Sequence, residues 1–219
     1  DEVRRSDNEG IPMIYNRQNR FRAANITPPP PPRAHYDTIY FRYGKESGTS
    51  GMYSDLHLVH DIYTPLHKAY SISIRPDSIP EGLASKMLIV QKGDDQSVSS
   101  AGGKWTEDFL TSEVLSFGAF YVGIDTIPPE INGNGLSEGA DLNGRKEMRI
   151  RITDDLSGIK SYVPEIDGKW ALFEYDQKNN VLIYRFDPEY ITRNSEHTLV
   201  LKVTDNRDNE SLFRRSFKW

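Results

Sequence analysis

The chain has 219 residues, with 27 Lys and Arg against 32 Asp and Glu, and it contains no cysteine. The net charge of -5 leaves no excess of cations to neutralise a phosphate backbone or an anionic lipid surface, so we expect no binding to nucleic acid or to an anionic membrane surface. No apolar run approaches the roughly 20 residues needed to span a bilayer, so we expect no membrane insertion. The absence of cysteine excludes disulfides, cysteine-ligated zinc and thiol catalysis. The 12 Tyr, 9 Phe and 3 Trp favour β-strands, because flat rings pack well on a pleated surface.

Residues 1–32 are polar, and we expect an irregular tail there, with apolar anchors only at Ile11 to Tyr15 and Phe21. The tail ends in five prolines, Pro28 to Pro32, which predict a stiff polyproline II spacer of about 15 Å. Ile11 to Tyr15 could alternatively complete the sheet of a neighbouring subunit by strand addition. Because the chain starts at Asp1, we expect either that an export signal was removed or that a longer protein was cut.

Residues 33–124 show the two-residue period of strands, as in Ile39, Phe41 and Tyr43, and predict a β-sandwich domain. The continuous apolar run Met87 to Val90 is typical of a central strand. We expect strands over residues 37–43, 56–62, 70–75, 87–90 and 117–124, with turns at 44–51 and 97–103.

A second break falls at Pro128 and Pro129, since paired prolines cannot continue a β-ladder. Residues 125–219 then predict an immunoglobulin-like β-sandwich, because short strands recur with short turns. We expect strands over residues 148–153, 159–166, 170–175, 181–186, 197–204 and 212–219. The dipeptide Asp167-Gly168 predicts a type I′ hairpin turn. The expected fold class is all-β, with two tandem β-sandwich domains after the tail.

Four segments of the second domain carry a family resemblance: DTIPPEI from Asp125, DDLSGIKSY from Asp154, IDGKWALFEYD from Ile166 and HTLVLKVTDNRDNES from His197. Three more lie in the first domain: YDTIYFRY from Tyr36, HLVHDIYTPLH from His57 and FGAFYVGIDT from Phe117. Together they resemble the non-catalytic C-terminal region of lysostaphin-type (LytM) zinc metallopeptidases of Bacteroidetes. The resemblance implies a periplasmic, outer-membrane-associated or extracellular protein that works at peptidoglycan.

The resemblance also implies that the zinc ligands lie in a peptidase module N-terminal to this region. His57 and Asp61 repeat the four-residue spacing of that family's first zinc ligands, but the flanking glycines and a later His-x-His are missing from the sequence. We therefore expect a strand with outward polar positions at His57, no catalytic residues and no cofactor in this chain, and zinc only in the absent module of a murein endopeptidase.

Acidic turns at the ends of two strands of the second domain offer a calcium site. If the strands alternate up and down, Asp154, Asp155, Asp205 and Asp208 gather at one end of the sandwich, and calcium takes six to eight oxygen ligands. The alternative is that these side chains cap their own turns through backbone hydrogen bonds.

Aromatic residues raise a further binding hypothesis. Trp105, Trp170 and Tyr175 are candidates for stacking on a glycan, whereas the alternative is that these rings are buried in the two cores. The resemblance to the metallopeptidase family implies an accessory region that positions or anchors an exported metallopeptidase, through peptidoglycan or an envelope protein or glycan. An independent glycan-binding or protein-binding adhesion module is the alternative.

Overall fold

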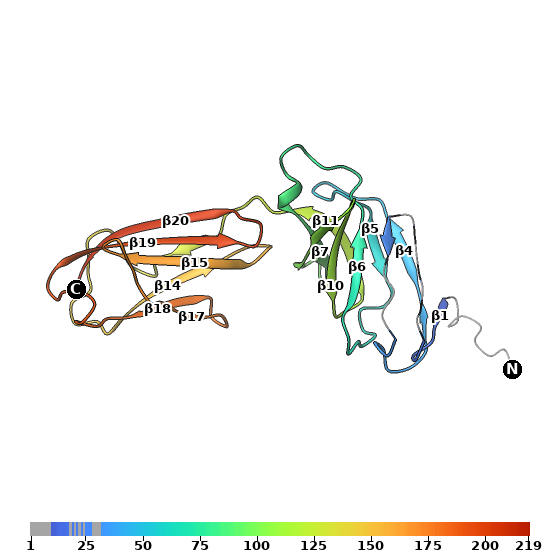
Figure 1. The fold of residues 1–219 in the computed structure, drawn as a ribbon, viewed down its shortest axis with the longest axis horizontal. Coiled ribbons are helices and arrows are strands. Elements are labelled where there is room, and N and C mark those ends of the chain that lie inside the picture. Colours follow the sequence, from blue (N-terminus) through green and yellow to red (C-terminus); the bar gives the residue numbers. More distant parts are fainter. Residues whose placement is uncertain (1–9, 18, 20, 22, 24, 28–31) are drawn as a thin grey trace. The chain divides into compact units, whose positions relative to one another are not determined.

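The computed structural model describes residues 10–17, 19, 21, 23, 25–27 and 32–219, and the chain divides into two compact units, residues 1–125 and 126–219. In the described residues the regular structure is β-strand, apart from one 3-10 turn, η1 (Ala84–Lys86). None of these residues forms a helix that is long and apolar enough to cross a membrane. The predicted all-β class with two sandwiches is confirmed (Figure 1).

The first unit packs a four-stranded sheet, in the order β2-β6-β10-β9, against a five-stranded sheet, in the order β4-β5-β11-β7-β8. The strands of the first sheet are β2 (Ile26–Thr27), β6 (Tyr70–Ile74), β10 (Phe109–Val114) and β9 (Lys104–Thr106). Those of the second are β4 (Tyr43–Glu46), β5 (Leu56–Val59), β11 (Gly118–Ile124), β7 (Met87–Lys92) and β8 (Val98–Gly102). A separate pair joins β1 (Ile11–Met13) to β3 (Ile39–Phe41).

The core of the first unit follows the predicted alternation. Tyr70, Ile72 and Ile74 are buried on one face of β6, while Ser71 is exposed on the other. Met87 to Val90 are all buried, and β7 lies between β11 and β8 inside its sheet, which confirms the predicted central strand.

Two segments of the predicted tail join the first unit. β1 pairs antiparallel with β3, and β2 pairs antiparallel with β6, so Ile11 to Met13 forms its ladder within its own chain. Met13 and Ile26 are buried in the core. Met13 belongs to the predicted anchor Ile11 to Tyr15, whereas Ile26 was not among the predicted anchors. Four of the five prolines, residues 28–31, lie outside the described residues, so the polyproline spacer stays a prediction.

The second unit has the strand order of an immunoglobulin-like sandwich, as predicted. One sheet has the order β12-β14-β18-β17 and the other β13-β20-β19-β15-β16, which correspond to A-B-E-D and A′-G-F-C-C′ in immunoglobulin lettering. Figure 1 labels β14, β18 and β17 of the first sheet and β20, β19 and β15 of the second. The strands of the first are β12 (Glu130–Asn132), β14 (Glu147–Thr153), β18 (Val181–Arg185) and β17 (Glu174–Asp176). Those of the second are β13 (Ala140–Asp141), β20 (Glu210–Lys218), β19 (Glu196–Asp205), β15 (Ile159–Ile166) and β16 (Lys169–Trp170).

The sequence predicted one strand over residues 170–175, and this prediction is wrong. The stretch contains parts of two short strands, β16 and β17, which belong to opposite sheets. β16 ends one sheet and β17 ends the other, and the chain crosses between them at residues 171–173. Ala171 and Phe173 are buried during the crossing, so the apolar residues that resembled strand alternation instead close the side of the sandwich. The crossing brings the two sheet edges to the same side of the unit, where the candidate site lies.

Candidate functional site

A groove with a volume of about 650 Å³ lies where β16 and β17 end their sheets. We call it the Trp170 groove and define it by six of its lining residues: Asp167, Trp170, Glu174, Arg185, Asp187 and Tyr190. Asp167 and Trp170 come from the β15–β16 hairpin, Glu174 and Arg185 from β17 and β18, and the last two from the loop before β19. Both sheets therefore contribute to the groove.

The groove carries large apolar side chains that the core does not cover. Trp170 is 67% exposed, Tyr190 is 78% exposed and Leu172 is 64% exposed. Trp170 lies on β16, a two-residue strand at the edge of its sheet beside β15, where its ring is exposed. A ring that stacks on a sugar must be exposed, and the ring of Trp170 is. The neighbouring ring of Tyr184 is buried in the core.

Charged groups surround these rings. Arg185 Nη1 donates to Glu174 Oε1 at 2.5 Å, and Asp187 Oδ1 accepts a hydrogen bond from the Glu189 N–H at 2.9 Å. An ionised carboxylate has about four lone-pair sites, so the carboxylates of Glu174 and Asp187 keep capacity to accept bonds from a ligand.

The Asp167 carboxylate contacts two residues of β19. Asp167 and Gly168 have φ values of 53° and 74°, which confirms the predicted type I′ turn. The Asp167 carboxylate lies 2.7 Å from His197 Nδ1 and accepts the Thr198 N–H at 2.8 Å. Burial acts to raise the pKa of Asp167, but the hydrogen bonds from His197 and Thr198 outweigh it, and the pKa lies below its ordinary value. Asp167 is therefore ionised at neutral pH.

A second groove, with a volume of about 730 Å³, borders the other end of β17. We call it the Tyr175 groove; it is lined by Ile159, Lys160, Ser161, Tyr162, Tyr175, Asp176 and Gln177. The rings of Tyr162 and Tyr175 meet edge to face with centroids 5.7 Å apart. Tyr175 is half-buried, and burial raises the pKa of its hydroxyl, which donates to Asn180 Oδ1 at 3.4 Å.

Trp105 lies in the first unit, on β9, whereas both grooves belong to the second unit. It is half-buried against the first core, and its Nε1 donates to the Ala84 carbonyl at 2.9 Å. Of the predicted stacking residues, Trp170 and Tyr175 therefore line grooves of the second unit, and Trp105 belongs to the first unit.

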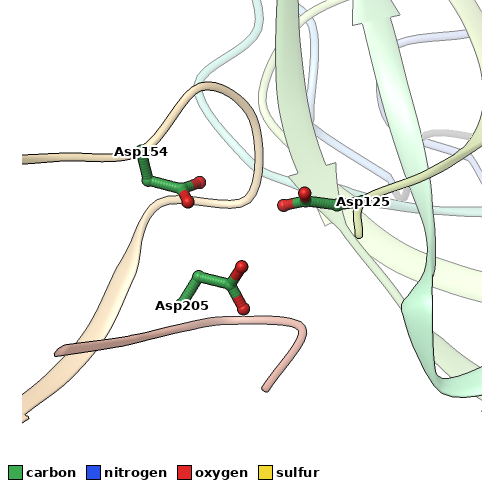
Figure 2. A group of neighbouring side chains, drawn as sticks. All are labelled: Asp125, Asp154 and Asp205. Carbon is green, nitrogen blue, oxygen red and sulfur yellow. The ribbon is translucent and has the colours of Figure 1, made fainter. Parts of the chain in front are cut away.

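The acidic turns of the second unit bring together two of the four predicted calcium ligands. Asp154 follows β14 and Asp205 ends β19, and their carboxylate oxygens lie within 4.8 Å of each other. Figure 2 shows these two side chains on neighbouring turns, and also draws Asp125, the last residue of the first unit. Asp208 instead binds Lys160, with Nζ and Oδ1 2.5 Å apart, and Asp155 is exposed.

Residues of the same turns donate hydrogen bonds to the Asp154 and Asp205 carboxylates. Asp154 Oδ2 accepts the N–H groups of Leu156 at 3.2 Å and Gly158 at 2.7 Å. Asp205 Oδ1 accepts the N–H groups of Arg207 at 2.7 Å and Asn209 at 2.9 Å, and its Oδ2 accepts Asn209 Nδ2 at 2.7 Å. These are the bonds expected of carboxylates that cap their own turns.

His57 is not an outward polar position, which corrects the prediction for β5. Its side chain is 1% exposed, Nδ1 lies 2.8 Å from the Tyr43 hydroxyl, and burial lowers the pKa of the ring. The strand ends at Val59, and His60 has a φ of 54°, so Asp61 does not continue the strand. Asp61 Oδ1 instead accepts the Tyr63 N–H at 3.0 Å. The even spacing of His57 and Asp61 therefore does not place them on one strand face.

Sequence reasoning missed Tyr190, Leu172 and Asp187 as groove residues. Tyr190 and Asp187 lie in a loop with no period, and Leu172 lies in the crossing between sheets, so no pattern indicated which way each side chain faces. The contact between Asp167 and His197 joins residues from two strands, and only the pairing of β15 with β19 brings them together.

The profile of one protein family, described as the Zu5-like domain, matches residues 11–125. The match begins with β1 and ends at the last residue of the first unit, so it includes the two strands found in the predicted tail. No curated protein matches the chain.

Proposed function

The chain belongs to the Zu5-like domain family, and we propose that its two units form the accessory, wall-binding region of an exported cell-wall metallopeptidase-like protein. The region would act at peptidoglycan, in the periplasm, on the outer membrane or outside the cell. Its task is to hold a catalytic module near its substrate, and the zinc chemistry would belong to that module.

The exposed pair Trp170 and Tyr190, set among carboxylates, is the observation that carries this proposal. The apolar faces of sugar rings stack on flat aromatic side chains, and sugar hydroxyls donate to carboxylates such as Asp167 and Asp187. Binding pockets combine apolar walls with a few placed polar groups in this way. A groove of about 650 Å³ is within the size range of small-ligand sites.

The test is retention of the purified chain on insoluble peptidoglycan, compared with Trp170→Ala. We expect the variant to need about tenfold more protein for half-saturation, the change produced by ~1.4 kcal/mol of lost binding energy. Tyr63→Ala is the matched control, because it removes a ring that is 80% exposed in the first unit. Equal retention of the parent chain and Trp170→Ala would overturn the assignment of the groove.

The alternative is an independent adhesion module that recognises another glycan or a protein, and the same groove would serve it. The two functions differ in which polymer is retained. Retention on peptidoglycan above that on chitin and cellulose supports the wall-binding region. Retention on another polysaccharide but not on peptidoglycan supports the adhesion module and rejects the assignment as a wall-binding region.

A further inference from the structure

We propose that the Trp170 groove and the Tyr175 groove are two subsites of one binding edge, and that this edge binds a linear oligosaccharide long enough to contact both. The inference rests on the proposed glycan binding and deepens it, because it specifies an extended chain over a single sugar or a chain end.

The two grooves follow each other along β17. Glu174 lines the Trp170 groove, and the next two residues, Tyr175 and Asp176, line the Tyr175 groove. At about 3.3 Å per residue, the Cα atoms of Glu174 and Asp176 are about 7 Å apart. β15 gives the same order in reverse, since Ile159 lines the Tyr175 groove and Ile166 lines the Trp170 groove. A chain lying along this edge passes from one groove into the other.

One hydrogen bond ties the two sheets together near both grooves. The Tyr162 hydroxyl, from β15, donates to the Phe173 carbonyl at 3.2 Å, and Phe173 lies in the crossing segment just before β17. The Phe173 side chain is buried in the core. Because the bond joins an edge of one sheet to the start of an edge strand of the other, it fixes the spacing of the subsites before a ligand arrives.

Each subsite combines aromatic rings with polar groups. The Trp170 groove has Trp170 and Tyr190 beside Asp167 and Asp187, and the Tyr175 groove has Tyr175 with Tyr162. The charges of the two grooves nearly balance, with four carboxylates (Asp167, Glu174, Asp176 and Asp187) against three cations (Lys160, Lys169 and Arg185). A nearly balanced edge with many acceptors suits a hydroxyl-rich chain of low charge density better than a densely charged polyanion.

An extended peptide is the competing occupant, because β17 is a sheet edge. Strand addition gains its affinity from consecutive main-chain pairs, and β17 offers a strand of only three residues. The exposed rings of Trp170 and Tyr190 lie beyond that strand, in β16 and in the loop before β19, where a paired peptide would not use them. A glycan chain lying along the edge would contact both the residues of β17 and the exposed rings of Trp170 and Tyr190.

The experiment measures the affinity of the chain for soluble peptidoglycan glycan fragments of increasing length, from disaccharide to octasaccharide, by calorimetry. We expect affinity to rise with length until both subsites are filled. Tyr175→Ala should then lower affinity for the longest fragment about tenfold and leave the disaccharide unchanged. Trp170→Ala should weaken every fragment, because it removes the subsite that the shortest one occupies.

A second variant guards against loss of fold, since Tyr175 packs against the core. Ser161→Gln adds bulk at an exposed residue of the Tyr175 groove without removing a core contact, and should also weaken only the long fragments. Ser71→Gln, at an exposed strand position of the first unit, is its matched control.

Three results would reject the extended edge. Equal affinity for all lengths, with Trp170→Ala still weaker, would leave the proposed function standing with one subsite. Binding of an extended peptide in place of every glycan fragment would assign the edge to strand addition. Absence of binding to every fragment, together with no retention on insoluble peptidoglycan, would reject both the edge and the proposed function.

Discussion

The Asp167 carboxylate ties the β15–β16 turn to the start of β19, through His197 and the Thr198 N–H. Both nitrogens of the His197 ring face acceptors, since Nε2 lies 2.7 Å from the Thr192 carbonyl. The ring is buried, so a lost contact is not replaced by water. Asp167 therefore stabilises the hairpin on which Trp170 is mounted.

At the scale of this residue, Asp167→Asn should lower the free energy of unfolding of the second unit by about 1 kcal/mol at pH 7. Asparagine tolerates the positive φ of the turn, so the change tests the charge and its bonds and leaves the backbone intact. For a unit of this size we expect a fall in Tm of roughly 4–8 °C by calorimetry. Asp155→Asn, at an exposed carboxylate, should leave Tm within error, and an equal fall there would contradict the assignment.

The stabilising effect of Asp167 should depend on pH, and the parent chain and Asp167→Asn can be compared to measure this. The folded-state pKa of Asp167 lies below the ordinary 3.8, so its contribution is fully present above pH 3.8 and is lost as the pH falls through the lowered value. The Tm difference between the parent chain and Asp167→Asn should therefore be present at pH 4 and shrink as the pH falls further. A difference that persists unchanged at lower pH would mean that the carboxylate charge is not what stabilises the turn.

At the scale of the element, β2 brings a residue from before the prolines into the first core. Ile26 is 0% exposed and pairs with Ile74 of β6. Ile26→Ala should lower the stability of the first unit by about 2–5 kcal/mol, the range for removing a buried aliphatic side chain. Ile11→Ala, at an exposed position of β1, should change it by less than about 1 kcal/mol. Equal small effects of both changes would show that β2 does not contribute to the core.

Strands with a clear period were predictable, and those without one were not. In Tyr70 to Ile74 and in Met148 to Thr153, apolar residues alternate with polar ones, and both segments form strands in the structure. β8, over Val98–Gly102, was expected to be a turn because it is rich in serine and glycine, yet it pairs with β7 at the sheet edge. Its residues form a strand because β7 supplies the pairing, which is a tertiary effect that no local propensity reports.

The groove was predictable only in part. Trp170 and Tyr175 could be named from residue type, but their exposure depends on the crossing at residues 171–173, which the sequence pattern concealed as one strand. Tyr190 required a loop conformation, and no turn signal specified which way its ring faces. Fold class depends on many residues that agree with one another, whereas a binding surface depends on the direction of a few side chains.

At the scale of the whole molecule, both grooves are built from residues 159–197, which lie inside the second unit. Residues 126–219 have their own core of buried side chains from both sheets, so we expect this segment to fold alone. The isolated segment should then bind the longest glycan fragment with the affinity of the full chain, within about threefold. Trp170→Ala in the isolated segment should reproduce the loss expected in the full chain.

Comparing the retention of residues 1–125 and of residues 126–219 on peptidoglycan shows which unit binds the wall. If residues 1–125 are retained on peptidoglycan as well as the full chain is, while residues 126–219 are not retained, the Zu5-like unit is the wall-binding part and the groove is not. If only residues 126–219 are retained, the first unit is left free to hold a protein partner or to space the binding edge from a catalytic module. Because each segment carries its own core, a lost interaction in either can be separated from unfolding by its calorimetric transition.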